Sequence, residues 1–466
     1  MYHKFEYKIV VLFFSILLIC SCSKEENTTP ITGEEMEEEM MEQNEMDTLL
    51  GGKNYLNLDS EYIFDQGKLL TFELNLPEAS LEFLDDDPAA EEYVEGSLSF
   101  EGETIGPVGI RYKGSIGAYV GCLSGTNWAN PSGFKTCTKL SMKVKINWED
   151  SDTKFYGLKK LQLHSMNLDE SQMRDRLGYW LFREMGVPAP RSVHARLVIN
   201  GQYVGLFALV EQIDGRFTRY NFDDGNGNLY KEVWPLDSDG NVLSESAFLS
   251  GLKTNEDENP SVALIRNFGT EILEANESEL KTVINKWMDL DQIMSYIAVD
   301  RTIAVDDGAF HWYCNGNDCT NHNYYWYEET DIEKLHLIPW DMDNSFENII
   351  FDSNPVTPIA DEWGEITNNC NPFSSGAFGA RQKSAVCDKL TKAWVLFDEE
   401  YQLKLDQFKD GPLSEARIEE QLNAWTNQIR QATIEADVSH SDAINVSTWE
   451  NALKNLRRQL DFARSN

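Results

Sequence analysis

The spacing of apolar residues changes along this chain, and the change constrains the fold more than any other feature. In the first part, apolar residues alternate with polar ones, as at 69–76, 96–100 and 108–114, which predicts strands. From Glu271 onward the spacing is mainly helical. We therefore expect an α+β fold in which a strand-rich lobe precedes a mainly helical lobe, with a cleft between them.

One predicted strand, 140–146, carries a row of polar residues along its length. Its period of two places Leu140, Met142, Val144 and Ile146 on one face. The opposite face then carries Lys139, Ser141, Lys143 and Lys145.

A helix and a hairpin are predicted after this strand. The helix begins at Asp169, which is a good N-cap residue, and ends at Gly186. Strands at 193–199 and 203–210 follow, and the Asn200–Gly201 pair between them is typical of a tight hairpin turn.

Two aspartates follow the predicted apolar strand at 335–339. Asp341 and Asp343 are two residues apart, so their carboxylates can share a hard cation such as Mg²⁺ if they lie on one face. A calcium hand is disfavoured, because Ser345 and Phe346 stand where that loop needs a ligand and a glycine. A solvated strand end is the alternative.

Other polar residues precede this pair in an informative order. The acids Asp306 and Asp307 come before a glycine, and Asn323 opens the predicted strand 323–327. An acid, an amide and then the paired acids is the order in which kinase-like enzymes place a catalytic base and two metal ligands. Asp-Gly is also a common turn, and the aromatic run in that strand is also typical of a core.

The N-terminal segment predicts export. Lys4 and Lys8 precede an apolar run at 9–19 that is too short to span a bilayer, which is typical of a cleaved signal. We expect a lipoprotein signal peptide at 1–22 with Cys22 as the acylated residue, and simple secretion or, less favoured, a retained signal anchor are the alternatives. The acidic segment 23–55 is expected to be a disordered tether. These features predict an extracytoplasmic protein anchored by lipid to a bacterial membrane, at the outer membrane or cell surface.

The charge of the chain excludes one class of partner. Its 466 residues carry a formal charge of −38, of which the tether holds only a small part. Nucleic acid needs clustered Lys and Arg, and no long basic run occurs here, so we expect no nucleic-acid partner.

Six cysteines remain after the two in the signal peptide. In an oxidising compartment an even number favours pairing, and the simplest pattern joins sequence neighbours. The expected disulfides are Cys122 with Cys137, Cys314 with Cys319, and Cys370 with Cys387. A zinc site built from His311, Cys314, Cys319 and His322 is the less favoured alternative.

Several segments together resemble a known family. They are, in order, 108–115 (VGIRYKGS), 139–146 (KLSMKVKI), 163–176 (LHSMNLDESQMRDR), 185–190 (MGVPAP), 199–214 (INGQYVGLFALVEQID) and 338–346 (IPWDMDNSF). In this set the chain is similar to the CotH family, the spore-coat protein H type of secreted kinase-like proteins. The resemblance runs from about residue 60 to residue 350.

The resemblance implies a two-lobed atypical protein-kinase fold that uses ATP with Mg²⁺ or Mn²⁺ to phosphorylate Ser or Thr of a protein substrate. It implies a kinase-like domain at 56–390, with 391–466 as a helical extension of the second lobe. The lipid anchor would be the only contact with a membrane. The phosphate acceptor is not identified by the sequence.

Carried over by position, the resemblance also implies residue roles. Asp307 would be the catalytic acid, with Asp306 as the alternative. Asn323 and Asp341 would be metal ligands, and Asp343 a second metal ligand or its support. Lys139 or Lys143 would neutralise the nucleotide phosphates, and Glu211 would be the acidic partner of that lysine.

Two other functions stay open at this point. A non-catalytic adhesion or scaffold protein of the cell surface could retain the fold, because free ATP is scarce outside cells. A polysaccharide-processing lipoprotein is a weaker alternative, raised by the twelve tryptophans and the paired acids.

Overall fold

The computed structural model describes residues 60–115, 117–127, 129–258, 260–350, 362–367, 369–374 and 381–466. They belong to one compact unit, Asn54–Asn466. The expected signal peptide at 1–22 and tether at 23–55, including Cys22, lie outside the described residues. In the described part of the chain, no helix has the length and apolar composition that a membrane span requires.

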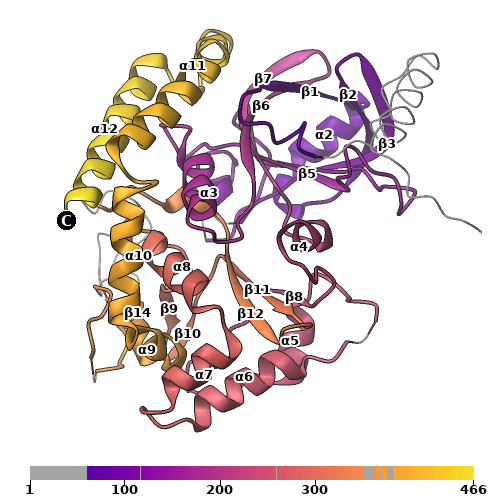
Figure 1. The fold of residues 1–466 in the computed structure, drawn as a ribbon. Helices are drawn as coiled ribbons and strands as arrows, with labels where there is room; N and C mark the ends of the chain where they lie inside the picture. The colour runs from indigo at the N-terminus through magenta and orange to yellow at the C-terminus, as the bar shows by residue number, and fades with distance from the viewer. Residues whose placement is uncertain are drawn as a thin grey trace, which may run out of the picture. The chain divides into compact units, whose positions relative to one another are not determined.

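The first lobe is a closed barrel with the strand order β1-β2-β3-β4-β5-β7-β6 (Figure 1). Neighbouring strands are antiparallel except for the parallel pair β1 and β6. The strands are β1 (Leu70–Asn75), β2 (Val94–Phe100), β3 (Glu103–Tyr112), β4 (Met142–Lys145), β5 (Lys160–His164), β6 (Ser192–Ile199) and β7 (Gln202–Val210).

The barrel forms because its strands alternate as the sequence predicts. Ile110, Val144 and Leu161 are paired across β3, β4 and β5, and all three are buried in the barrel core. The next row along, Arg111, Lys143 and Gln162, therefore lies on the opposite face of the sheet. That face holds the basic residues.

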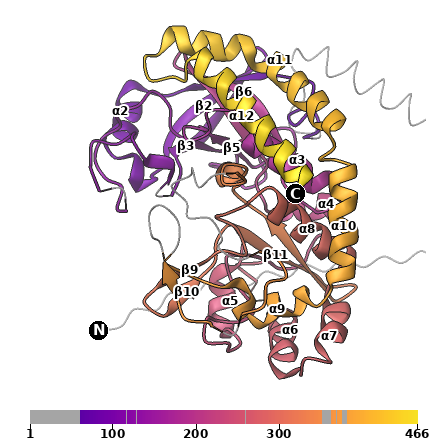
Figure 2. The same ribbon diagram turned by 90° about the vertical axis from the view of Figure 1, so that its left-hand side faces the viewer.

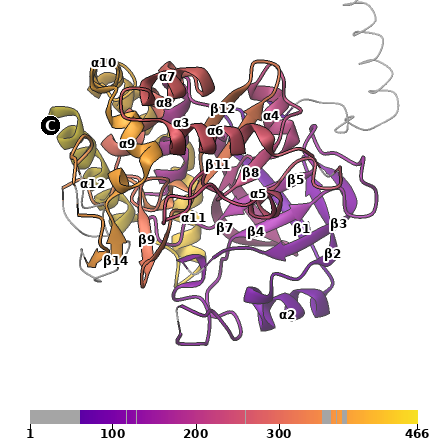
Figure 3. The ribbon, with the colours of Figure 1, turned by 90° about the horizontal axis from the view of Figure 1, so that it is seen from below.

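Two helices complete the first lobe. Helix α2 (Glu78–Asp86) lies beside β2, away from the helices of the second lobe (Figure 3). Helix α3 (Arg174–Glu184) connects β5 to β6. The predicted start of this helix at Asp169 is wrong, because Gln172 has a left-handed φ of 60° that interrupts the helical path. Asp169 instead accepts the backbone N–H of Ser171 at 2.9 Å and of Arg174 at 2.8 Å.

The hairpin of β6 and β7 is confirmed. Asn200 and Gly201 have φ values of 48° and 75°, which is the left-handed pair that a two-residue type I′ turn requires. This turn fixes the pairing of Ile199 with Gln202 and of Val198 with Tyr203, and a shift of one residue follows, so that Leu197 lies opposite Gly205 and Ser192 opposite Val210.

The second lobe is mainly helical and begins earlier than the sequence pattern indicates. Its helices are α4 (Gly215–Asn221), α5 (Glu245–Gly251), α6 (Ala263–Glu274), α7 (Leu280–Trp287), α8 (Leu290–Thr302), α9 (Lys389–Val395) and α10 (Asp398–Asp410). One sheet consists of β8 (Leu229–Lys231), β11 (Tyr324–Glu329) and β12 (Lys334–Pro339). A second sheet consists of β9 (Trp312–Asn315), β10 (Asp318–Thr320), β13 (Phe373–Ser374) and β14 (Arg381–Lys383).

Two long helices end the chain and contact the first lobe. Helix α11 (Glu415–Ser439) lies along β7, and α12 (Val446–Ser465) runs beside it (Figure 2). The hydroxyl of Tyr203 donates to the carbonyl of Ala432 at 3.0 Å, and Trp449 Nε1 donates to the carbonyl of Ser171 at 3.0 Å. Helices α9 and α10 pack instead within the second lobe.

Candidate active site

The acidic part of the site lies where β12 ends. The chain leaves this buried strand at Asp341, whose φ of 58° is left-handed, and Asp343 follows in a short 3₁₀ turn. Met342 between them is buried against Gly178 of α3, where an added methyl group would come within 2.9 Å of the methionine side chain. The backbone N–H of Asp341 donates to the Tyr179 hydroxyl at 2.9 Å. Helix α3 thus fixes the turn that carries both carboxylates.

Asp307 forms the second acidic position, in the turn that follows α8. Its carboxylate accepts a hydrogen bond from the Tyr313 hydroxyl at 2.7 Å and another from Asn323 Nδ2 at 3.0 Å. Asn323 Nδ2 also donates to the Asp307 carbonyl at 2.9 Å. Asn323 itself has a left-handed φ of 58°, a conformation that asparagine tolerates better than most residues. Its Oδ1 has no hydrogen-bond partner among the described residues, so this oxygen can serve as a ligand.

Asp306 has a different environment from its neighbour. It is 2% exposed, and its Oδ2 accepts a hydrogen bond from Asn348 Nδ2 at 2.9 Å, whereas Asp307 is partly exposed. The structure therefore brings Asp307, and not Asp306, together with Asn323.

The acids act on one another electrostatically. Burial, together with the charges of Asp341, Asp175 and Asp307, raises the pKa of Asp343 well above its usual range. Burial also raises the pKa of Asp341, and the charge of Asp175 adds to the rise while that of Lys113 opposes it. Burial raises the pKa of Asp307 to about 7, and the charge of Asp341 adds to the rise. A cation bound among these groups would stabilise all of them.

Arg111, Lys113 and Lys143 form a basic wall on the outer face of β3 and β4. Lys113 is the member on which Asp341 and Asp175 act, whereas Arg111 is paired with Glu91. Burial nevertheless lowers the pKa of Lys113 to about 8. Burial and the charges of Lys160, Lys113 and Arg111 lower the pKa of Lys143 to about 7. Crowded lysines of this kind are stabilised by an anion.

Lys113 makes the best-defined contacts of the basic wall. Its Nζ lies 3.1 Å from Gln162 Oε1 and 2.8 Å from His164 Nε2. His164 Nδ1 in turn lies 3.2 Å from Asp175 Oδ2. Ligand atoms of His164, Asp175 and Asp341 all lie within 4.8 Å of one another.

Lys139 and Glu211 lie in other surroundings than the resemblance implies. Lys139 Nζ donates to the Leu206 carbonyl at 2.9 Å, and the carboxylates that act on its pKa are Asp169 and Asp442. Glu211 accepts hydrogen bonds from Arg191 at 2.6 and 2.9 Å and lies 3.3 Å from Arg216. Within the described residues, Glu211 is thus paired with arginines in place of a lysine.

Lys113, His164 and Asp175 were not assigned from the sequence. They lie within segments that carry the family resemblance, 108–115 and 163–176, but no local pattern marks them as a group. Only the pairing of β3 with β4 and of β4 with β5, together with the start of α3, brings them together.

The carboxylates around Asp341 offer ligands for a divalent cation, and the group whose ligand atoms lie within 4.8 Å of one another is His164, Asp175 and Asp341 among the described residues. Carboxylate and amide oxygens are the ligands that Mg²⁺ prefers, and Asp341, Asp343, Asp307 and Asn323 supply them here. Asp175 adds one buried oxygen, Oδ1, that has no hydrogen-bond partner among the described residues. An unsatisfied buried acceptor of this kind favours a bound cation or water.

The three expected disulfides are confirmed, between Cys122 and Cys137, Cys314 and Cys319, and Cys370 and Cys387. The pairing of Cys314 with Cys319 leaves no thiolate for the zinc alternative, because zinc binds the deprotonated thiol.

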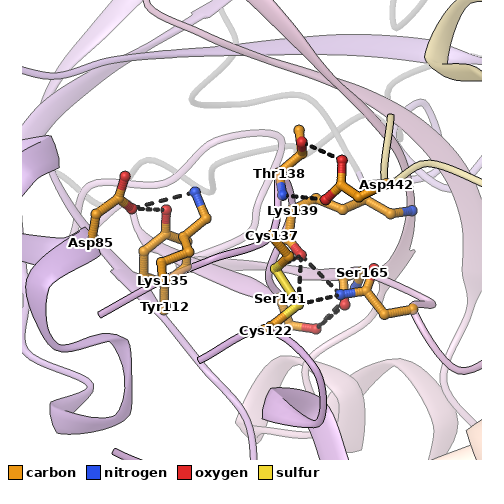
Figure 4. Close-up of a disulfide and its surroundings, with 11 residues drawn as sticks. Asp85, Tyr112, Cys122, Lys135, Cys137, Thr138, Lys139, Ser141, Ser165 and Asp442 are labelled. Carbon is orange, nitrogen blue, oxygen red and sulfur yellow. Dashed lines mark hydrogen bonds and ion pairs between the residues drawn. A yellow bond between two sulfur atoms is a disulfide. The ribbon is translucent and has the colours of Figure 1, made fainter. Parts of the chain in front are cut away.

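The Cys122–Cys137 disulfide fixes the segment between β3 and β4 (Figure 4). Immediately after it, the backbone N–H and the hydroxyl of Thr138 each donate to Asp442 at 2.6 Å. Asp442 lies between α11 and α12, so these bonds join the segment to the C-terminal helices. On its other side, Lys135 lies 3.3 Å from Asp85 of α2.

A barrel lobe and a helical lobe that bring a basic wall and clustered carboxylates together define a kinase-like protein. More particularly, the chain belongs to the family described as CotH kinase protein, whose sequence model matches residues 110–465.

Curated relatives match parts of the chain. The inner spore coat protein H of Bacillus subtilis (strain 168) is 23% identical over 200 residues, which are 41% of this chain and 50% of that protein. The inner spore coat protein H-like protein of the same organism is 41% identical over 63 residues, 14% of this chain and 20% of that protein. The chain thus spans about half the length of the first relative and a fifth of the second.

Two solved structures resemble the chain loosely. The Shewanella oneidensis MR-1 toxin–antitoxin complex of HipA, HipB and operator DNA matches at 11% identity and a TM-score of 0.26, over 79% of this chain and 74% of that one. The Helicobacter pylori proinflammatory kinase CtkA matches at 12% identity and a TM-score of 0.22, over 68% and 96% respectively. These scores give no basis for comparing individual residues.

Proposed function

We propose that this protein is an extracytoplasmic protein kinase, anchored by a lipid at Cys22, that transfers the γ-phosphoryl group of ATP to Ser or Thr of a protein substrate. The observation that carries the proposal is the meeting of a basic wall with an acidic group in which Asn323 is bonded to Asp307. Phosphoryl transfer requires mainly positioning and charge neutralisation, which such an arrangement provides.

In this proposal Asp307 accepts the proton of the substrate hydroxyl. A base works best when its pKa lies near the working pH, and burial raises that of Asp307 to about 7. The hydrogen bonds from Tyr313 and Asn323 hold its carboxylate in one orientation. Substrate hydroxyls reach Asp307 because it is partly exposed, whereas the buried Asp306 is not accessible to them.

Asn323, Asp341 and Asp343 would hold Mg²⁺ or Mn²⁺, which neutralises phosphate charge when bound. Lys143 and the other residues of the basic wall would lie on the phosphate side. The three disulfides support a location in an oxidising compartment, as the predicted export signal does.

The test is phosphate transfer by the purified protein with ATP and Mg²⁺ or Mn²⁺, followed by mass spectrometry of the protein itself and of Ser-rich substrates. Asp307→Asn is expected to lower the rate by roughly 100-fold or more, because general-base catalysis contributes that much, while ATP still binds. Asp306→Asn is the matched neighbour and should retain activity wherever it folds. No transfer by the wild-type protein to any substrate would contradict the proposal.

A non-catalytic adhesion or scaffold protein is the second candidate, favoured by the same disulfides, since free ATP is scarce outside cells. Thermal unfolding separates the two functions. A nucleotide-binding protein unfolds at a higher temperature with ATP and metal, by mass action, whereas a scaffold that has lost the site does not.

A further inference from the structure

Lys113 is the lysine of the basic wall whose position is determined by other side chains. An ammonium group has no acceptor, so it donates to Gln162 Oε1 at 3.1 Å and to His164 Nε2 at 2.8 Å. Because Nε2 of His164 accepts, its proton is on Nδ1, which donates to Asp175 Oδ2 at 3.2 Å. Asp175 therefore fixes the tautomer and the ring orientation of His164, and His164 fixes Lys113.

The fold produces this chain of contacts from three elements. Tyr112 of β3 is paired with Met142, and Met142 is paired with Leu163 of β5. The residues that follow, Lys113 and His164, therefore lie together on the opposite face of the sheet. Asp175 comes from the first turn of α3.

The same group lies against the acidic end of β12. Trp340, which precedes Asp341, has its ring 5.6 Å from Lys113 Nζ and 5.8 Å from the His164 ring. Two buried polar atoms of the group have no hydrogen-bond partner among the described residues: Gln162 Nε2, a donor that suits a phosphate oxygen, and Asp175 Oδ1, an acceptor that suits a cation. Leaving such atoms unpaired costs free energy, so their presence points to a ligand that completes the site.

We propose that Lys113 binds the phosphate groups of the nucleotide, and that His164 and Asp175 are positioning residues that orient it. This inference rests on the proposed kinase function and names the residues that bind its nucleotide. Two of the three ammonium N–H groups have acceptors, which leaves the third for a phosphate oxygen. Because the direct partners are a neutral imidazole and an amide, the lysine keeps its positive charge for the phosphates.

Lys143 is the rival on the same wall. In the described part of the chain it makes no hydrogen bond or ion pair, and the charges of Lys160, Lys113 and Arg111 lower its pKa while that of Glu91 opposes them. No described side chain orients the ammonium group of Lys143. This lysine therefore adds positive charge to the wall but is not held in position to bind a particular phosphate oxygen.

The experiment compares ATP with adenosine, both titrated calorimetrically into the purified protein with Mg²⁺. Lys113→Met is expected to weaken ATP binding about tenfold or more and to leave adenosine binding unchanged, because only ATP carries the phosphates. Lys145→Met is the matched control, since Lys145 lies on the same face of β4 but outside the basic wall, over the ring of Trp148, and it should bind both ligands as the wild type does.

The positioning role is tested with His164. His164→Phe keeps a ring but loses both nitrogens. We therefore expect ATP binding to be about threefold to tenfold weaker, and the fold decrease in kcat to exceed the fold increase in KM. His164→Gln restores an acceptor for Lys113 and should recover most of both. If His164→Phe keeps wild-type ATP affinity and kcat, or if Lys113→Met binds ATP normally, the inference is wrong.

A measurement on the wild-type protein keeps the test independent of variant folding. Reductive methylation followed by mass spectrometry should modify Lys113 in the free protein and modify it much less with Mg²⁺ and ATP, whereas Lys145 should react equally in both. Equal labelling of Lys113 with and without ATP would overturn its assignment even where ATP binds. A wild-type protein that binds no ATP would overturn the proposed function together with this inference.

Discussion

Neighbouring residues in this chain have different roles because burial separates them. Asp306 and Asp307 are adjacent, but only Asp307 is partly exposed and bonded to Asn323. Asp300, a little earlier in α8, is fully buried, and neither of its carboxylate oxygens has a hydrogen-bond partner among the described residues. Its nearest cation, Arg301 Nη1, is 3.9 Å away. Burial therefore raises the pKa of Asp300 to about 8.

The raised pKa of Asp300 predicts how stability depends on pH. The folded protein holds a proton on Asp300 up to about pH 8, whereas the unfolded chain loses it near pH 4, so the free energy of unfolding falls as pH rises between these values. The asparagine of Asp300→Asn cannot ionise. In this variant the free energy of unfolding should therefore fall less steeply with pH, by up to about 1.4 kcal/mol per pH unit. Urea unfolding of both proteins at pH 5 and pH 8 measures the difference.

Asp398→Asn is the control for this prediction, because Asp398 is exposed at the start of α10. It should follow the wild-type pH dependence. If the free energy of unfolding of Asp300→Asn changed with pH as steeply as that of the wild type, the prediction would be contradicted.

At the scale of elements, the segment between β3 and β4 shows how a long connection is held near a site. The Cys122–Cys137 disulfide closes a loop of sequence separation 15, and Thr138 and Lys135 bind it to Asp442 and Asp85. Lys113 precedes this segment and β4 follows it. The disulfide therefore limits the motion of the segment that joins Lys113 to Lys143 of the basic wall.

Replacing Cys122 and Cys137 together with serine should lower the free energy of unfolding by about 2–4 kcal/mol, the usual contribution of a disulfide that closes a loop of this size. Chemical denaturation of the oxidised protein and of the double variant gives the difference. A Cys122/Cys137 variant as stable as the wild type would show that Thr138 and Lys135 hold the segment without the disulfide.

Elements with a clear period could be predicted from the sequence, and contacts between elements could not. The hairpin of β6 and β7 and the alternation in β4 were predicted correctly, because turn residues and burial act locally. The carboxylate pair of Asp341 and Asp343 could also be recognised, because it directly follows an apolar strand in the sequence. Lys113 was not assigned, because its partners depend on the register of β3, β4 and β5 and on α3. The start of α3 was misplaced, because the left-handed Gln172 has no local signal.

At the scale of the whole molecule, the C-terminal helices join the parts of the described chain. The buried guanidinium of Arg176 in α3 lies 2.8 Å from His194 of β6 and donates to Gln428 of α11 at 2.7 Å. Trp449 of α12 is fully buried in the same hydrophobic core as α3 and the second lobe. These helices are therefore part of the folded body.

Trp449→Ala should lower the free energy of unfolding by about 3–5 kcal/mol, because it leaves a large cavity in the core. Phe462→Ala, on the same helix but 45% exposed, should change it by no more than about 0.5 kcal/mol. Urea denaturation measures both variants. A Trp449→Ala protein as stable as the Phe462→Ala protein would mean that α12 contributes little to the fold.

The central claim is that the basic wall and the acidic group together form a site for ATP with a divalent metal. Calorimetric titration of ATP into the wild-type protein, with Mg²⁺ and again with EDTA, tests it most directly, and Asp341→Asn is the variant to compare. We expect binding that requires the metal and that weakens about tenfold or more in the variant. No binding of ATP with Mg²⁺, or binding that is equal in EDTA and in the variant, would contradict the account.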